Sequence, residues 1–364
     1  MSDRFLATTL RPMRALGATA VLLAAVVAAC ATPRLRSVAI ADAPSFSVRS
    51  IALPGASPTG VSLDYLAYDR PHHRVWVPAG ETASVVVIDA DAGDRLAVVS
   101  GFATAEIERH GEKRRVGPSS ATIGRGVVYV GNRGDSSVCA VDAISLRLGP
   151  CLTLSAMPDG LAYVASTNEV WVTTPRRRSI VIVDASSPSA LTSKGEITLD
   201  GAPEGFAVDD ARRVFYTNLE DRDRTLAIDL TTRHVTHTWQ PDCGEAGPRG
   251  LALDHEGNVL LVACTDHVVA LDAGHDGTRL SAISVGGGLD NIDFVETRHE
   301  LYAAAAHVAT LTIASLDREG RLTPVTVVPT RPGARNAVAT EQGVAYLTDA
   351  SEGKILVVAP SPQR

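Results

Sequence analysis

The chain has 364 residues, 45% of them hydrophobic, with 34 basic and 41 acidic side chains and a formal net charge of −7. This length and apolar content suffice for a substantial core, while the acidic balance argues against nucleic acid as a general partner, because binding to phosphates needs a basic surface. The sequence contains no Gly-x-Ser-x-Gly elbow, no His-Glu-x-x-His and no phosphate-binding glycine-rich loop, which excludes the enzyme classes that those motifs define.

Residues 1–29 are predicted to be an export signal. Three arginines precede an uncharged run from Ala15 to Ala29, which is the order of a secretory signal peptide. The run is too short for a good transmembrane span, which needs about 20 apolar residues. The Val-Ala-Ala that precedes Cys30 resembles the lipobox of bacterial lipoproteins, which implies lipidation of Cys30. The alternative is an ordinary signal peptide with an incidental cysteine, and export is expected in either case.

Residues 30–46 are predicted to form a flexible tether, because they are rich in Ala, Pro and Ser and show little periodicity. Without residues 1–29 the chain keeps 31 basic and 40 acidic residues, a formal net charge of −9. The predicted folded part spans residues 47–361. We therefore expect a monomeric protein of the periplasm or cell surface that is attached to a membrane through its lipid.

Seven related segments follow. Each has a Gly or Pro turn, a short apolar strand, a strand rich in β-branched and aromatic residues, a polar loop, and a strand that ends in or near Asp. Such self-similarity at 40–45 residues indicates a β-propeller of four-stranded blades. The predicted fold class is therefore all-β, a seven-bladed β-propeller of four-stranded antiparallel blades. The segments start at residues 58, 117, 158, 203, 248, 288 and 333.

The two ends of the repeat region carry further information. The last segment offers only three strands before Pro360, and the segment that starts at Ser45 reads as a strand. We expect this N-terminal strand to complete the last blade and so remove two open sheet edges. The first interval, of 59 residues, is longer than the others because it includes a charged insertion around residues 101–117.

Four cysteines remain after Cys30, and pairing is expected in an oxidising compartment. Cys139 and Cys151 flank a turn near Ser145, so they can face each other across adjacent antiparallel strands. Cys243 and Cys264 then form a second pair between an inter-blade loop and the next blade. The alternative is four buried thiols that pack as small hydrophobic groups.

The units VVYVGNRGDSSVCAVDA and VFYTNLEDRDRTLAIDL resemble the repeat of the bacterial YVTN-repeat (YncE-like) β-propellers. The resemblance covers residues 47–361, and a Gly-Ala-Arg turn at Gly333 adds to it. The fifth and sixth units depart from the pattern, because LLVACTDHVVALD and LYAAAAHVATLTI lack its Asn. The resemblance implies the propeller fold and leaves the biochemical activity open.

The innermost strands of a propeller begin at the channel mouth, so the residues at these starts converge on one ring. They carry carboxylates and guanidinium groups that are able either to pair with one another or to hold a charged small ligand. The predicted ring comprises Thr59, Ser119 or Ser120, Asp159, Glu204, Arg249, Asp290 with Asn291, and Arg335 with Asn336.

Two other groups of charged residues stand out. An Asp that recurs at equivalent strand ends is expected to stabilise turns, and these residues are Asp89, Asp142, Asp184, Asp229 and Asp272. The insertion is a candidate binding loop over the same mouth, or else a solvated segment. Its charged residues are Glu106, Glu108, Arg109, His110, Lys113, Arg114 and Arg115. His72-His73 and the run Arg176–Arg178 are expected to be surface features.

Three functional hypotheses remain. The first is a binding or scaffold module for a small molecule or an envelope protein at the channel mouth, which needs no cofactor. The second is a metal-dependent lactonase of the gluconolactonase type, in which Asp159, Glu204, Asp290 and Asn291, with Asn336, hold a divalent cation. The third, a nucleic-acid-binding propeller, is disfavoured by the acidic charge and by export.

Overall fold

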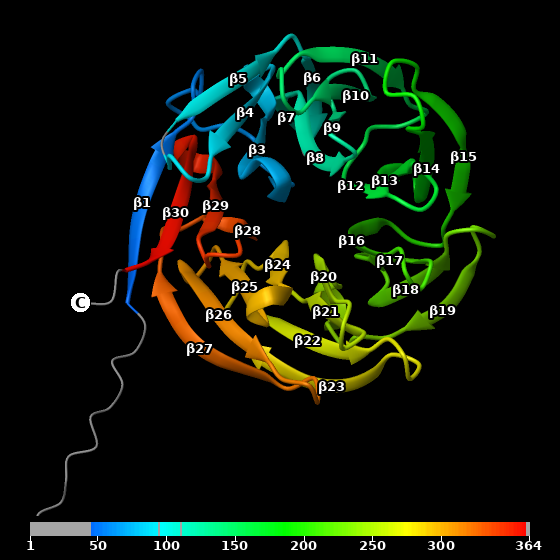
Figure 1. Ribbon diagram of the computed structural model, residues 1–364, viewed down its shortest axis with the longest axis vertical. Helices are drawn as coiled ribbons and strands as arrows, with labels where there is room; N and C mark the ends of the chain where they lie inside the picture. Colours follow the sequence, from blue (N-terminus) through cyan, green and yellow to red (C-terminus); the bar gives the residue numbers. More distant parts are fainter. Residues whose placement is uncertain (1–44, 94, 110, 362–364) are drawn as a thin grey trace, which may run out of the picture. The chain divides into compact units, whose positions relative to one another are not determined.

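The computed structural model describes residues 45–361 except 94 and 110. This part of the chain is all-β and forms seven four-stranded antiparallel sheets that surround a central channel as the blades of a propeller (Figure 1). The predicted signal peptide (residues 1–29), Cys30 and most of the predicted tether (residues 30–46) lie outside the described residues. In the described part, no helix is long and apolar enough to cross a membrane.

Six blades run from the innermost to the outermost strand in chain order. Blade one consists of β2 (Ala67–Asp69), β3 (Arg74–Ala79), β4 (Ser84–Asp89) and β5 (Leu96–Ser100). Blade two consists of β8 (Pro118–Gly124), β9 (Val127–Asn132), β10 (Ser137–Asp142) and β11 (Leu148–Thr153). Blade three consists of β12 (Leu161–Val164), β13 (Glu169–Thr174), β14 (Ser179–Asp184) and β15 (Thr192–Thr198). Blade four consists of β16 (Pro203–Asp209), β17 (Val214–Leu219), β18 (Arg224–Asp229) and β19 (Val235–Trp239). Blade five consists of β20 (Leu251–Asp254), β21 (Val259–Ala263), β22 (His267–Asp272) and β23 (Thr278–Ser284). Blade six consists of β24 (Ile292–Val295), β25 (Glu300–Ala305), β26 (Thr310–Leu316) and β27 (Leu322–Pro329).

Blade seven is assembled from both ends of the described chain, as predicted. Its strands β28 (Arg335–Ala339), β29 (Ala345–Asp349) and β30 (Lys354–Pro360) are completed by β1 (Phe46–Ala52). The antiparallel register of β1 and β30 runs from Phe46 opposite Pro360 to Ala52 opposite Lys354. The N-terminal strand therefore closes the ring and covers what would otherwise be an open edge of β30.

The core lies between neighbouring blades. The second strand of several blades carries a large side chain that is at most 1% exposed, and these side chains are Trp76, Tyr129, Trp171, Tyr302 and Tyr346. Each of these aromatic rings packs against the facing sheet, as Tyr129 does against Leu161 and Val172 of the next blade. The alternation of β-branched and aromatic residues thus supplies the flat apolar faces through which the blades stack.

The sequence-based start of the first blade, Pro58, is wrong. Ser57 and Gly60 form an isolated bridge in a tight turn, and the innermost strand β2 begins only at Ala67. The Pro-Thr-Gly sequence of this turn is similar to the Gly- or Pro-containing turns that precede the innermost strands of the other blades. The true counterpart of Pro158-Asp159 in blade three is Leu63-Asp64.

The cysteines form two disulfides. Cys139 on β10 is opposite Cys151 on β11 and is bonded to it. Cys243, in the connection between blades four and five, is bonded to Cys264 at the end of β21. The first disulfide therefore joins the two outer strands of blade two, and the second fixes the connection that enters blade five.

The recurring Asp residues stabilise turns, as predicted. The Asp229 carboxylate accepts hydrogen bonds from the backbone N–H groups of Thr231 and Thr232, at 3.0 and 2.6 Å. Equivalent bonds form at the other recurring positions, Asp89, Asp142, Asp184 and Asp272. These turns connect the third and fourth strands of their blades.

Candidate functional site

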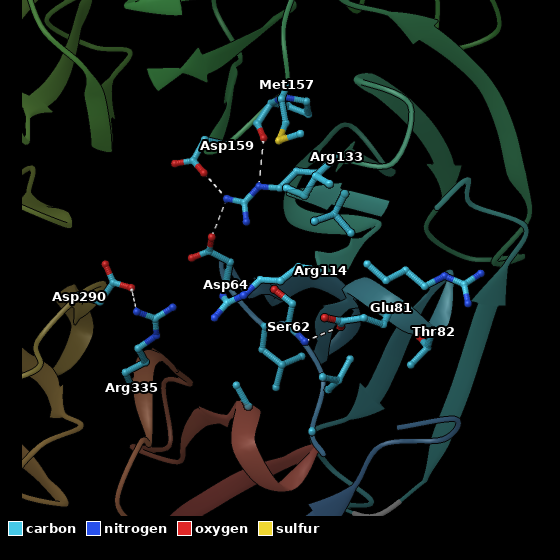
Figure 2. Close-up of a pocket in the computed structure, with 18 of the residues that line it drawn as sticks. Ser62, Asp64, Glu81, Thr82, Arg114, Arg133, Met157, Asp159, Asp290 and Arg335 are labelled. Atoms are coloured by element: carbon cyan, nitrogen blue, oxygen red, sulfur yellow. Dashed lines mark hydrogen bonds and ion pairs between the residues drawn. The ribbon is translucent and has the colours of Figure 1, made fainter. Parts of the chain in front are cut away.

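Two sets of connections meet at one end of the channel. Because the strands of each blade alternate in direction, the connection into the innermost strand and the connection between the second and third strands lie at the same end. Here residues of all seven blades line a cavity of about 1050 Å³, which we call the mouth cavity (Figure 2). Its charged lining consists of Asp64, Glu81, Lys113, Arg114, Arg115, Arg133, Asp159, Arg176, Glu204, Glu220, Arg249, Asp290 and Arg335.

Arg133, which follows β9, links three blades on one side of the mouth cavity (Figure 2). Its guanidinium contacts the carboxylate of Asp64 at 2.7 Å and that of Asp159, and its Nε donates to the carbonyl of Pro158 at 3.3 Å. Burial alone lowers the pKa of Arg133, but the two carboxylates more than offset this and raise it. Burial also raises the pKa of Asp159 to about 6, against the attraction of Arg133.

Two further ion pairs lie on the other side of the mouth cavity. Arg335 contacts Asp290 at 2.9 Å, and Arg249 contacts Glu220. The Arg335 side chain is 43% exposed, whereas that of Asp290 is 12% exposed. Burial raises the pKa of Asp290, although Arg335 acts in the opposite direction. Arg335 therefore holds a largely buried carboxylate, while its own side chain lines the cavity and stays partly exposed.

Glu204, near the start of β16, has a different environment from the other carboxylates. In the described part of the chain, its one hydrogen bond comes from the Tyr65 hydroxyl at 3.5 Å, and no cationic side chain forms an ion pair with it. The Tyr65 ring stacks on Phe206 with a centroid distance of 5.6 Å. Burial raises the pKa of Glu204 well above its usual value, and the carboxylates nearby, first Asp159, raise it further. The site thus favours the protonated form of Glu204.

The structure separates the predicted ring into two groups. Asp159, Glu204, Arg249, Asp290 and Arg335 all line the mouth cavity, and Thr59 lies at its edge.

The remaining ring residues are outside the cavity lining. Asn336 is 1% exposed, accepts the N–H of Asn291 at 3.0 Å and donates to the carbonyl of Asp64 at 3.2 Å. Ser119 and Ser120 are buried beside β9. Asn336 therefore joins blades six, seven and one, and the backbone of Ser119 and Ser120 joins blade two to Tyr65 of blade one.

Four residues that make the contacts described above are missing from the predicted ring. Asp64 and Tyr65 are missing because the first blade is misaligned, although Leu63-Asp64 matches Pro158-Asp159. Arg133 and Glu220 are missing because they follow the second strand rather than precede the first. The antiparallel order of the strands places these two positions at the same end of the blade, and that rule would have identified them.

The charged insertion forms a hairpin beside the mouth. Its strands β6 (Ala105–Arg109) and β7 (Glu112–Val116) connect blade one to blade two. Lys113, Arg114 and Arg115 line the cavity, and Arg115 donates to the Thr104 hydroxyl at 3.0 Å from Nε. Arg176, expected to be a mere surface feature, also lines the cavity because it follows a second strand, β13. The insertion and Arg176 thus give this side of the rim a positive charge.

The residues of the lactonase hypothesis do not form a ready metal site in the described part of the chain. Among all the residues that the structure describes, no three His, Cys, Asp or Glu side chains are arranged to hold a metal ion. Asp159 and Asp290 already pair with Arg133 and Arg335. A divalent cation would have to displace these guanidinium groups, which carry the same sign of charge.

Comparison with known proteins supports the fold. No family model matches the chain, and no curated protein matches its sequence. Solved structures of similar fold include the mitotic checkpoint complex, with 15% identity over 88% of this chain and 95% of that one and a TM-score of 0.67. U3-55K has 10% identity over 86% of this chain and 98% of that one, with a TM-score of 0.68.

An enzyme of similar fold is also found. Virginiamycin B lyase from Staphylococcus aureus, solved as a catalytically inactive variant with quinupristin, has 10% identity over 87% of this chain and 100% of that one, with a TM-score of 0.67. At such identities the likeness extends to the fold alone. The class that the fold and the site define is a seven-bladed β-propeller with a charged cavity at its channel mouth.

Proposed function

We propose that this propeller is a binding module for a small polar molecule, which it holds in the mouth cavity. The observation that carries the proposal is the composition of that cavity. Its volume of about 1050 Å³ is at the upper end of ordinary small-molecule sites, and all seven blades contribute to a lining with six acidic and seven basic side chains. The channel-mouth position agrees with the fold, since the varying connections of a repeat protein converge there.

The ion pairs of the mouth cavity support binding because they fix the recognition groups in advance. Arg133 is held by two carboxylates and a carbonyl, and Arg335 is held by Asp290. A ligand that meets groups already in place loses less conformational entropy on binding. The exposed edge of Arg335 and the carboxyl group of Glu204 then remain for contacts with the ligand.

A ligand screen tests this proposal. The purified full-length protein, in detergent, is unfolded by heat in the presence of fractions of a bacterial metabolite extract. A ligand at a hundredfold excess over its Kd should stabilise the folded state by about 2.7 kcal/mol, and mass spectrometry then identifies it.

The variants Arg335→Gln and Glu204→Gln should lose this stabilisation. Glu319→Gln, whose side chain is 66% exposed in the turn of blade six, should keep it. Fractions that stabilise all three variants equally would place binding outside the mouth cavity, and stabilisation by no fraction would contradict the proposal.

We further propose that the module is exported and held at a membrane through Cys30, as a member of the YVTN-repeat propellers. The support is the signal-like run of residues 15–29, the Val-Ala-Ala before Cys30, and the YVTN-like strands. In a bacterial host the wild-type protein should incorporate radiolabelled palmitate and fractionate with membranes. Cys30→Ser should incorporate no label, and labelling of that variant would exclude Cys30 as the lipidation site.

The metal-dependent lactonase is the second candidate, because Asp159, Glu204 and Asp290 line one cavity and desolvation raises the pKa of each carboxyl group. Thermal unfolding with a chelator, and then with added calcium, magnesium, manganese or zinc, separates the two functions. A cation-dependent stabilisation that Glu204→Gln abolishes would favour the lactonase and a screen of lactone substrates. Equal stability under all these conditions would exclude the cation site.

A further inference from the structure

Among the described acidic residues that line the mouth cavity, Glu204 has the weakest set of partners. Asp64 and Asp159 share Arg133, Glu220 pairs with Arg249, and Asp290 pairs with Arg335. Among the described residues, the one hydrogen bond to Glu204 comes from the Tyr65 hydroxyl, whose oxygen is 3.5 Å from the carboxylate oxygen Oε1, a long distance for such a bond. A partly buried carboxyl group with so little hydrogen bonding is unfavourable, unless a group that enters the cavity compensates for it.

The surroundings of Glu204 indicate the charge of that missing partner. The groups that interact with it are the Tyr65 hydroxyl, through the hydrogen bond, and the carboxylates of Asp159, Asp290, Glu220 and Asp64, through their charge. Arg133, Arg249 and Arg335 are close by, but each already pairs with one or more of these carboxylates. Glu204 itself has no cationic partner among the described residues, so it favours a positively charged ligand group, and an anionic group at this point would lie beside an unpaired carboxyl group.

Arg335 supplies the opposite charge a short way off. Its Nη1 contacts Asp290 at 2.9 Å, and the side chain is 43% exposed in the cavity (Figure 2). Asp290 is also close enough to Glu204 to raise its pKa. Asp290 thus interacts with both Glu204 and Arg335, and all three line the same cavity. A guanidinium presents five donors in a planar fork, so Arg335 retains donors for a carboxylate of a ligand.

We infer that the mouth cavity selects a small zwitterion, such as an amino acid or a short peptide, whose protonated amine contacts Glu204 and whose carboxylate contacts Arg335. The inference rests on the proposed binding function and specifies its ligand class. A purely anionic ligand would face the unpaired carboxyl group, and a simple amine would leave the Arg335 donors unused.

Isothermal titration calorimetry with chemically matched probes tests the inference on the full-length protein in detergent. The probes are γ-aminobutyrate and alanylalanine as zwitterions, butylamine as the amine alone, and butyrate as the acid alone. We expect at least one zwitterion to bind best, butylamine to bind more weakly, and butyrate to bind least. Losing one charge-assisted contact should weaken binding roughly tenfold to a hundredfold.

Two variants assign the ends of the ligand. Glu204→Gln keeps the size of the side chain but cannot become negative, so it should weaken zwitterions and butylamine alike. Arg335→Gln should weaken the zwitterions to the level of butylamine and leave butylamine itself unchanged. Glu319→Gln, an exposed position of blade six, should bind every probe as the wild type does.

Proton exchange provides a readout that needs no variant. An ammonium group stabilises the ionised form of Glu204, so its binding should release a proton, and the affinity should increase as the pH is raised. The released proton appears as a difference in binding heat between buffers of different ionisation enthalpy. Proton uptake, or an affinity that falls as the pH rises, would overturn the inference.

Failure of this inference is distinguishable from failure of the proposed function. If butyrate binds best and Arg335→Gln abolishes its binding, the cavity binds small molecules but the zwitterion is the wrong class. The same holds if only a neutral ligand from the metabolite screen depends on Glu204. If neither the probes nor the screen gives binding that depends on Glu204 or Arg335, both proposals fail.

Discussion

The two ends of each blade use acidic residues in opposite ways. At the turns between the third and fourth strands, the same residue recurs, and Asp89, Asp142 and Asp229 each accept two backbone N–H groups. At the mouth, the residue near the start of the innermost strand changes from blade to blade, from Asp159 to Glu204. The turn carboxylates accept hydrogen bonds from the backbone of their own turn, whereas the mouth carboxylates face a cavity.

This difference separates the sequence features that build the fold from those that build a site. A residue that recurs around the ring has the same structural role in each blade where it occurs. Here that role is to accept hydrogen bonds from the N–H groups of a tight turn. A residue that varies creates an asymmetric surface, which a specific ligand requires. The cost also differs, since the turn carboxylates remain hydrated while those of the mouth are buried and need either counter-ions or a ligand.

The largest effect on stability is expected for Arg133→Ala. The substitution leaves Asp64 and Asp159 without their shared counter-ion, and both side chains are at most 16% exposed. Removing one partner of a buried ion pair costs about 3 to 5 kcal/mol. We expect the free energy of unfolding, from denaturant titration at neutral pH, to fall by roughly this amount.

Arg321→Ala is the matched control for Arg133→Ala. Arg321 also contacts two carboxylates, Asp317 at 2.8 Å and Glu319 at 3.1 Å, but its side chain is 63% exposed. Exposed pairs contribute at most about 1 kcal/mol. If both variants lost the same free energy of unfolding, the ion pairs of the mouth would contribute no more to stability than those of the surface.

A second effect, of up to about 3 kcal/mol, is expected in the pH dependence of stability. Asp293 on β24 lies outside the mouth cavity, is partly buried, and accepts the N–H of Ala339 at 2.7 Å. Burial raises its pKa from 3.8 to about 6. Because the folded-state pKa is the higher one, Asp293 contributes most below pH 3.8, and this contribution is lost as the pH rises through 6.

Comparison of wild type with Asp293→Asn isolates this contribution. The difference in unfolding free energy between the two proteins should change with pH between about 4 and 6 and stay constant above about 7. Denaturant titrations at several pH values measure it. A difference that does not vary with pH would mean that Asp293 has an ordinary pKa.

The sequence predicts the fold well because the information is repeated. Each blade shows the same turn, the same alternation of β-branched and aromatic residues, and the same terminal Asp, so an error in one blade does not affect the others. The closure by β1 follows from a simple count, since the last unit has three strands and a fourth precedes the first unit. The predicted start of blade one is wrong because the tight turn at Ser57–Gly60 precedes Leu63-Asp64, the true counterpart of Pro158-Asp159, by only a few residues.

The site is harder to predict because it depends on pairing between blades. Asp159, Glu204, Arg249, Asp290 and Arg335 follow from their position at strand starts. No local pattern indicates that Arg133 takes two carboxylates while Glu204 receives no cation, because the partners are more than 25 residues apart in the chain. Side-chain burial decides which carboxyl group is left unpaired, and burial depends on the packing of the whole ring.

The smallest effect is expected at the repeated turns. The Asp89 carboxylate accepts the N–H groups of Asp91 and Ala92 at 3.0 and 2.9 Å, and these bonds lower its pKa. Asp89→Ala removes both, which should cost about 1 kcal/mol, and Asp89→Asn, which keeps an oxygen acceptor, should cost less. Denaturant titration measures both changes. Neither variant should alter ligand binding at the mouth, since turn and cavity are at opposite ends of the blade, and a loss of binding in Asp89→Ala would show that the two ends are coupled.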